Sequence, residues 1–239
     1  MLFDLKGKRK RAVQITYLGL AFLLAAGLIG AGIGSSTSGG LFDAITGGGS
    51  GGSNADKTIQ KRIAAAQKRL QLNPKDQAAY AIVVRSHYQL ATAQASQTGQ
   101  FNPKGQAQLQ QAATAWNRYL GIAKKPDPSL AILMIQAYGG LAQSKSPQDQ
   151  KPYLTGAADA AEVLTTAQPS INAYVQLVQY ATLAGQTPKA TLAGSQAVAL
   201  APKAQKKAVK AKVAQAKAQA AQAAAAQTQQ QTSTPPTGP

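Results

Sequence analysis

The sequence predicts an all-α protein, in which an N-terminal transmembrane helix precedes an α-solenoid of about three helix hairpins with flanking helices. Three observations lead to this fold class. Residues 13–34 carry no charge and directly follow a basic cluster. From residue 57 onward Ala, Gln, Leu and Lys dominate, and all four are good helix formers. Prolines interrupt this stretch at regular intervals, so it divides into helices of similar length.

The N-terminal segment predicts a membrane protein. As a helix, residues 13–34 measure roughly 33 Å, which is enough to cross a ~30 Å hydrocarbon core. Residues 1–12 are basic, and cytoplasmic flanks carry the excess of Lys and Arg, so we expect this end inside the cell. The expected localisation is therefore the cytoplasmic (inner) membrane, with a single span and the rest of the chain on the extracytoplasmic side.

A cleaved secretory signal is the alternative interpretation of the same segment. Small residues at 30–32 and at 35–36 would suit a signal peptidase. The apolar region of a signal is usually ~7–15 residues, however, and this one is longer. Both interpretations export the bulk of the chain. Since the chain has no cysteine, it can form no disulfide and carry no lipid on a cysteine.

Residues 35–56 are predicted to be a linker, because 46–53 read TGGGSGGS and cannot form a core. Asn-Pro, Ser-Pro and similar breaks then delimit the helices. The predicted helices are 57–72, 75–96, 104–123, 128–144, 148–167, 170–184, 188–200 and 203–226. Short connections indicate antiparallel neighbours. We divide this part into a repeat domain at 57–202, an Ala/Lys/Gln-rich capping helix at 203–226 and a polar, disordered tail at 227–239.

A repeating residue pattern accompanies these helix pairs. One set of residues falls at spacings of 3, 8, 5, 7 and 5: Tyr174, Leu177, Gly185, Ala190, Ala197 and Pro202. The glycine suits the end of a first helix, and the alanines let two helices approach closely. The pattern resembles the tetratricopeptide repeat (TPR). With the predicted span and the alanine-rich composition, the chain resembles a membrane-anchored TPR protein of the bacterial type.

The same register extends upstream, and it also departs from the family pattern. The matching first-helix positions are Ala131, Met134 and Tyr138 in the second repeat and Tyr80, Val83 and His87 in the first. Residues 70–74 read LQLNP, like the end of a preceding half repeat. Val178, Ala181 and Gly194 stand where the family usually has a small residue and two aromatics.

Composition argues against an enzyme. The chain has one histidine and one glutamate, His87 and Glu162; we expect the first to be packed in the core and the second to lie on a solvated helix face. No residues have metal-ligand spacing, and the glycine-rich stretch lacks the lysine of a phosphate-binding loop. We therefore expect no catalytic, cofactor-binding or metal-binding residues, and no cofactor.

The resemblance implies a binding face along the first helix of each pair, where TPR proteins hold extended segments. The residues that this register places there are Arg85, Tyr88, Gln89, Ile132, Gln136, Val175, Gln179 and Thr182. Arg85 is the only fixed charge among them, so the carboxylate clamp of chaperone-binding members is not expected. The leading hypothesis is thus a membrane-tethered scaffold for a protein or extended peptide.

The charge of the chain supports an alternative. The net charge is +17, and without the N-terminal cluster and Asp4 the rest carries +20 − 7 = +13. Most lysines after Glu162 lie in the capping helix: Lys203, Lys206, Lys207, Lys210, Lys212 and Lys217. This helix could bind an anionic envelope polymer or lipid surface. Nucleic acid is the weaker interpretation because no aromatic residues lie between the lysines. Salt separates the hypotheses, since charge-driven binding weakens steeply with ionic strength.

Overall fold

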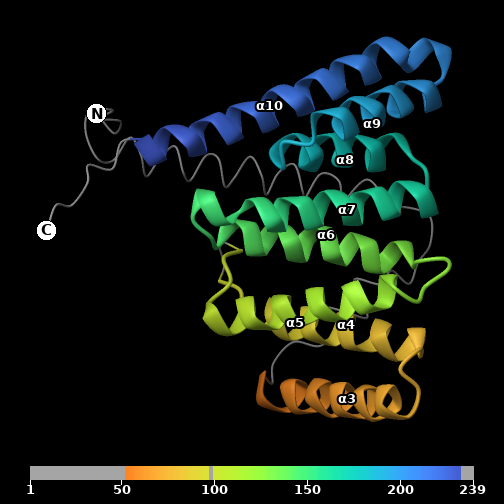
Figure 1. Cartoon of the computed structure of the whole chain (residues 1–239), viewed down its shortest axis with the longest axis vertical. Helices are drawn as coiled ribbons and strands as arrows, with labels where there is room; N and C mark the ends of the chain where they lie inside the picture. Colours follow the sequence, from red (N-terminus) through yellow and green to blue (C-terminus); the bar gives the residue numbers. More distant parts are fainter. Residues whose placement is uncertain (1–51, 97–98, 233–239) are drawn as a thin grey trace, which may run out of the picture. The chain divides into compact units, whose positions relative to one another are not determined.

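The computed structural model describes residues 52–96 and 99–232, and this part of the chain is all α-helical (Figure 1). Eight α-helices lie within it, and they are joined as antiparallel neighbours. Their bounds are α3 Gly52–Leu72, α4 Gln77–Thr92, α5 Pro103–Leu120, α6 Pro128–Gln143, α7 Lys151–Ala167, α8 Ile171–Leu183, α9 Thr187–Leu200 and α10 Lys206–Thr232. Two 3-10 turns, η1 (Pro147–Asp149) and η2 (Lys203–Gln205), precede α7 and α10. These residues contain no β-strand.

The helices form a solenoid-like stack of pairs. The most extensive contacts join α4 with α5, α6 with α7, and α8 with α9. Successive pairs meet through α5 and α6 and through α7 and α8, while α3 and α10 flank the three pairs. The first helices α4 and α6 also touch, as do α8 and α10, whereas no contact of that extent joins α6 with α8 or the second helices α5, α7 and α9 with one another. We name the side of the stack along which the first helices α4, α6 and α8 lie the inner face.

Side-chain caps fix where the helices begin. Asp76, Asn102, Asp127 and Ser170 each accept a hydrogen bond from a backbone N–H in the first turn of the helix that follows. At the other end of α8, Gly185 has φ = 75°, the left-handed conformation that glycine tolerates best. The turn that the sequence predicts at Gly185 is thus confirmed, and most helix bounds agree with the predicted ones within a few residues.

Small residues let the helices pack closely. Ala157, Ala190 and Ala197 are buried, as the repeat register predicts. A Cβ added at Gly194 of α9 would lie 2.8 Å from the Val213 side chain of α10. Real Cβ atoms essentially never come so close to a heavy atom, so the approach of α10 leaves no room for a side chain at position 194.

Both ends of the helical stack extend beyond the predicted limits. Helix α3 begins at Gly52, within the predicted linker, and α10 continues to Thr232, so residues 227–232 are helical rather than disordered. Alanine and glutamine are good helix formers, and no proline follows Pro202 before Pro235, which explains the longer α10. The predictions for 1–12, 13–34, most of the linker and 233–239 lie outside the described residues.

The predicted localisation requires correction. Within residues 52–96 and 99–232, no helix combines the length and the apolar character that a membrane span needs. The two longest helices, α3 and α10, are rich in Lys and Gln, whose transfer into hydrocarbon is costly. This finding contradicts the localisation in the cytoplasmic membrane, and we do not carry it forward. The span predicted at 13–34 itself lies outside the described residues.

The core of the third pair offers a test of the repeat register. Leu177 is 4% exposed, so Leu177→Ala should lower the free energy of unfolding by ~2–5 kcal/mol through lost burial and a residual cavity. Leu192→Ala is the control, because Leu192 on α9 is 63% exposed and should change stability by less than ~0.5 kcal/mol. Chemical denaturation of the full chain measures both. Equal effects would contradict the register.

Candidate functional site

The inner face carries one long polar side chain at the same position of each first helix. Arg85 on α4, Gln136 on α6 and Gln179 on α8 each stand five residues after the first residue of the repeat motif. Gln136 is exposed, and the other two are half-buried. These three predicted binding residues thus occupy equivalent positions on α4, α6 and α8, and we call them the ladder.

Arg85 is engaged within the fold. Its Nη2 donates to Oδ2 of Asp127 over 2.5 Å, and both side chains are about one-third exposed. Asp127 also caps α6 by accepting from the Ser129 N–H, and its own N–H donates to the Tyr119 hydroxyl. Burial raises the pKa of Asp127, but hydrogen bonds from Ser129 and the charge of Arg85 outweigh it, so the pKa lies below its ordinary value. Arg85 thus fastens the connection between the first two pairs.

Tyr88 also links two first helices. The residue is 9% exposed, and its hydroxyl donates to Oε1 of Gln136 over 2.5 Å. Burial raises the pKa of Tyr88 to about 12, so the phenol stays neutral at physiological pH. The structure therefore places Arg85 and Tyr88 in contacts between α4 and α6. Substituting either would change stability as well as any ligand binding.

Helix α4 is bonded to α3 and α5 as well. Gln89 accepts from Arg62 of α3 over 3.4 Å. His87 is 9% exposed, and its Nδ1 lies 2.6 Å from Oε1 of Gln108 on α5. Its packed position agrees with the repeat register, but its polar partner could not be foreseen from spacing. Two further buried polar groups of α4, the Ser86 hydroxyl and Arg85 Nε, have no hydrogen-bond partner within the described part of the chain.

The third first helix is partly covered by α10. On α8 Val175 is buried, and Thr182 is half-buried with its hydroxyl donating to the backbone of Val178. Lys212 of α10 donates from Nζ to Oδ1 of Asn172 over 2.8 Å. Asn172, Gln176 and Gln179 share one side of α8, because they are separated by four and three residues. The repeat register does not include the first two, although this spacing indicates them. Ile132 on α6 is half-buried.

The six lysines of the predicted cationic helix fall into two groups, those with a hydrogen-bonded side chain and those without. Lys212 bonds to Asn172, and Lys217 donates to the Thr191 hydroxyl of α9 over 3.2 Å. The other four are exposed, and their side chains form no ion pair or hydrogen bond in the described residues: Lys203, Lys206, Lys207 and Lys210. Opposite them, α10 buries a stripe of Val209, Val213, Ala216 and Ala220. Its 4-3-4 spacing places this stripe on one side of the helix, facing α8 and α9.

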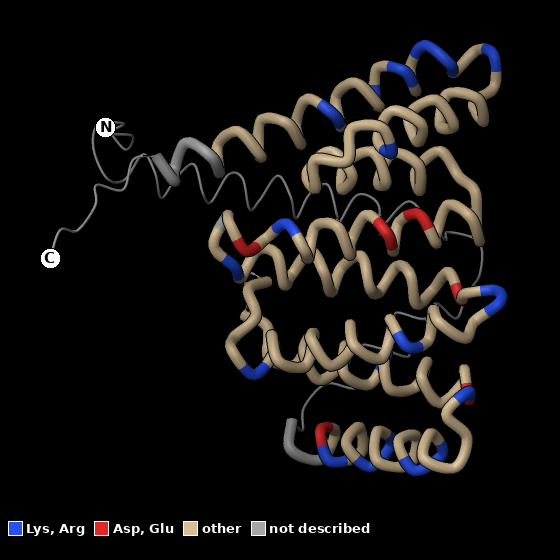
Figure 2. Tube along the Cα trace, viewed as in Figure 1, with Lys and Arg blue, Asp and Glu red and all other residues tan. Residues whose placement is uncertain are grey.

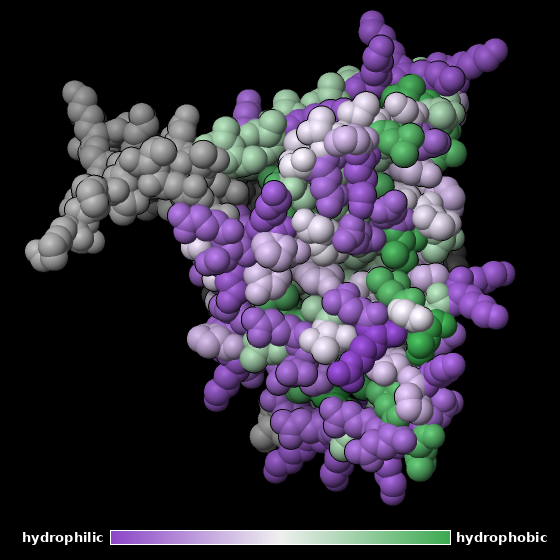
Figure 3. Space-filling model, viewed as in Figure 1, coloured by the Kyte–Doolittle hydropathy of each residue, from purple (hydrophilic) through white to green (hydrophobic). Residues whose placement is uncertain are grey.

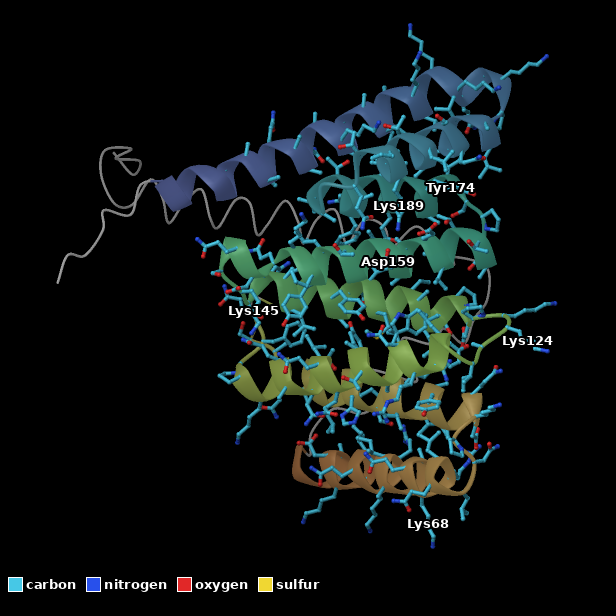
Figure 4. The ribbon with its side chains drawn as sticks, in the orientation of Figure 1. Lys68, Lys124, Lys145, Asp159, Tyr174 and Lys189 are labelled. Carbon is cyan, nitrogen blue, oxygen red and sulfur yellow. The ribbon has the colours of Figure 1, made fainter. Side chains whose placement is uncertain are left out.

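The described surface is strongly basic. Between residues 55 and 226 the sequence holds 20 basic and 6 acidic side chains. Four of the acids form ion pairs, one with Arg69, one with Arg85 and two with Lys189. Glu162 is one of these: it is solvated as expected, but it also pairs with Lys189 over 2.7 Å. Figure 4 shows Asp159 and Lys189 facing each other between α7 and α9.

The described surface has two shallow clefts. One of ≈ 410 Å³ lies between the start of α8 and the η2–α10 segment, and Ser170, Ile171, Val209 and Lys212 are among its lining residues. The other, of ≈ 260 Å³, lies between α3, α4 and α5 beside Asp56 and Lys104. Among the described residues no group of three or more His, Cys, Asp or Glu side chains could hold a metal ion.

No family model matches this chain, and neither a curated protein nor a solved structure matches it. The resemblance to tetratricopeptide repeats therefore stays a prediction that rests on the residues named above.

The Arg85–Asp127 pair makes stability depend on acidic pH. A depressed carboxyl pKa contributes stability above the unfolded pKa and loses it as the pH falls through the folded value. Asp127→Asn keeps the capping oxygen but removes the charge, so it should lower the free energy of unfolding at pH 7 by ~0.2–1 kcal/mol. This deficit should vanish below the folded pKa of Asp127. Denaturation curves measured at several pH values test this, and a deficit unchanged in acid would contradict it.

Proposed function

We propose that this protein is a helical-repeat scaffold of the tetratricopeptide type, which holds an extended segment of a partner protein along its inner face. The observation that carries this proposal is that Gln136 and Gln179 stand at the same motif position as Arg85 on three successive first helices, with Arg85 itself paired to Asp127. The paired helices, the left-handed Gly185 and the buried alanines at the crossings support the tetratricopeptide assignment.

Glutamine side chains suit the main chain of an extended peptide. A primary amide offers two donors and one acceptor oxygen, which match the N–H and C=O groups of a peptide unit. Gln136 already accepts from Tyr88, but its Nε2 remains available to donate. Packed helices lie 8–10 Å apart, and an extended chain advances ~3.3 Å per residue. An extended segment laid across the first helices would therefore reach the rungs of the ladder in turn.

Two glutamines without a side-chain hydrogen bond in the described residues allow a test that leaves the fold intact. Gln176 and Gln179 of α8 are half-buried, and no side-chain hydrogen bond joins them to other described residues. The double variant Gln176→Ala, Gln179→Ala should bind the captured partner about tenfold more weakly, because each lost hydrogen bond contributes ~0.5–1.5 kcal/mol. Affinity capture with the full chain, followed by titration of the recovered partner, measures the loss.

A matched control separates the inner face from the rest of the surface. Gln110→Ala, Gln196→Ala removes two exposed glutamines from the second helices α5 and α9. This variant should bind like the parent protein. If both double variants bind equally well, the inner face is not the binding site.

The four exposed lysines around the start of α10 favour a second candidate function, the binding of an anionic polymer. Replacing Lys203, Lys206, Lys207 and Lys210 by Gln removes four positive charges that have no counter-ion in the described part of the chain. If this variant abolishes partner binding while Gln176→Ala, Gln179→Ala does not, the polymer-binding function replaces the scaffold. Steep weakening of binding with added salt would point the same way.

A further inference from the structure

A second interaction surface follows from the topology of the stack. Each pair is antiparallel, so every connection from a second helix to the next first helix lies at the same edge. The four connections are 73–76, 121–127, 168–170 and 201–205, and we name this side the inter-pair edge (Figure 1). The connections within pairs lie at the opposite edge. We propose that the inter-pair edge binds an acidic segment of a partner protein that also carries large apolar side chains.

The edge exposes large apolar residues. Leu72 and Leu200 are 82% and 47% exposed, and they are two of the three large exposed hydrophobic residues in the described chain. Leu72 is the last residue of α3 and Leu200 the last residue of α9. Both begin the same four-residue sequence, Leu-x-Pro-Lys, at 72–75 and 200–203. Ile122 in the 121–127 connection is half-buried. In the space-filling view, hydrophobic residues recur along this side of the stack (Figure 3).

Lysines stand beside these apolar residues. Lys75 follows Leu72, Lys124 and Lys125 follow Ile122, and Lys203 follows Leu200. All four lysines are exposed, and none of their ammonium groups has an ion pair or hydrogen bond within the described residues. Figure 2 shows the basic residues at this edge, and Figure 4 places Lys124 there, across the stack from Lys145. The 168–170 connection has no charged residue.

The acidic residues of the same edge do not neutralise these lysines. Asp76 caps α4 and pairs with Arg69 over 2.8 Å. Asp127 caps α6 and pairs with Arg85. Both carboxylates are thus used within the fold by capping N–H groups and by arginines, and the lysines are left as a net positive row.

This combination identifies the chemistry of the partner. Lysine is a compact charge on a flexible stem, so it attracts carboxylates without demanding a fixed geometry. The exposed leucines gain only from a partner that buries them, and a nucleic acid backbone or an inorganic polyanion offers no aliphatic side chain for this purpose. An acidic protein segment with leucine-like residues supplies both contacts. With neighbouring helices 8–10 Å apart, a segment crossing the edge in extended form meets the connections in turn.

The test uses synthetic peptides and the full-length protein. The probe is a fluorescent decapeptide of alternating Glu and Leu, and the reference probes are an all-Glu decapeptide and a ten-nucleotide oligothymidylate. Replacing Lys75, Lys124, Lys125 and Lys203 by Gln should weaken binding of the Glu/Leu peptide about tenfold or more, since four modest surface ion pairs are lost together. Leu72→Gln, Leu200→Gln should weaken binding of the Glu/Leu peptide and leave that of the all-Glu peptide unchanged.

A control with the same change in charge lies at the opposite edge. Replacing Lys57, Lys104, Lys145 and Lys151 by Gln removes four lysines near the other ends of the helices. This control should bind within about twofold of the parent, which supports the proposal when the edge variants lose binding. Equal losses in both lysine variants, or equally tight binding of the all-Glu peptide or the oligothymidylate, would overturn it. Failure of the parent protein to bind the Glu/Leu peptide would also overturn it, without affecting the proposed inner face.

Discussion

The structure depends on the polar groups of α4, which bond this helix to three neighbours. Much of the described core is alanine, and small apolar side chains pack in several registers at similar free energy, because the hydrophobic effect has no direction. Hydrogen bonds are directional. The bonds of Arg85 and Tyr88 to α6, His87 to α5 and Gln89 to α3 therefore set how far each helix is shifted along the next.

In the third pair, fewer polar contacts set how far the helices are shifted along one another. On α9 the Lys189 ammonium bridges Asp159 and Glu162 of α7, which ties two second helices together. Burial lowers the pKa of Lys189, but the hydrogen bonds that its ammonium donates to both carboxylates outweigh burial and raise the pKa above its usual value. On the other side Gly194 admits Val213, so α10 lies close to α9. The C-terminal helix thus completes the last pair by steric fit, in the place that the first helix of a further pair would take.

Local signals in the sequence predicted the helices well, but they could not predict contacts between residues far apart in the sequence. Prolines and the capping residues Asp76, Asn102, Asp127 and Ser170 act within a few residues, so the helix breaks could be identified directly. The partners of Arg85 and Tyr88 lie 42 and 48 residues away, and spacing alone placed both side chains on an open face. The same limit applies to Lys212 and Lys217, which looked free in the sequence and bond to α8 and α9. The inter-pair edge became visible only when the helix directions were known.

The aromatic cluster of the first pair has a practical consequence. Trp116 is the only tryptophan in the chain; it is 1% exposed and stacks on Tyr119 with ring centroids 5.5 Å apart. Its fluorescence therefore reports the state of the α4–α5 pair, while circular dichroism reports all the helices at once. In a stack where each pair touches only its neighbours, the two signals coincide if unfolding is cooperative and separate if the pairs melt one by one. The protein thus carries an internal reporter for the coupling between its own repeats.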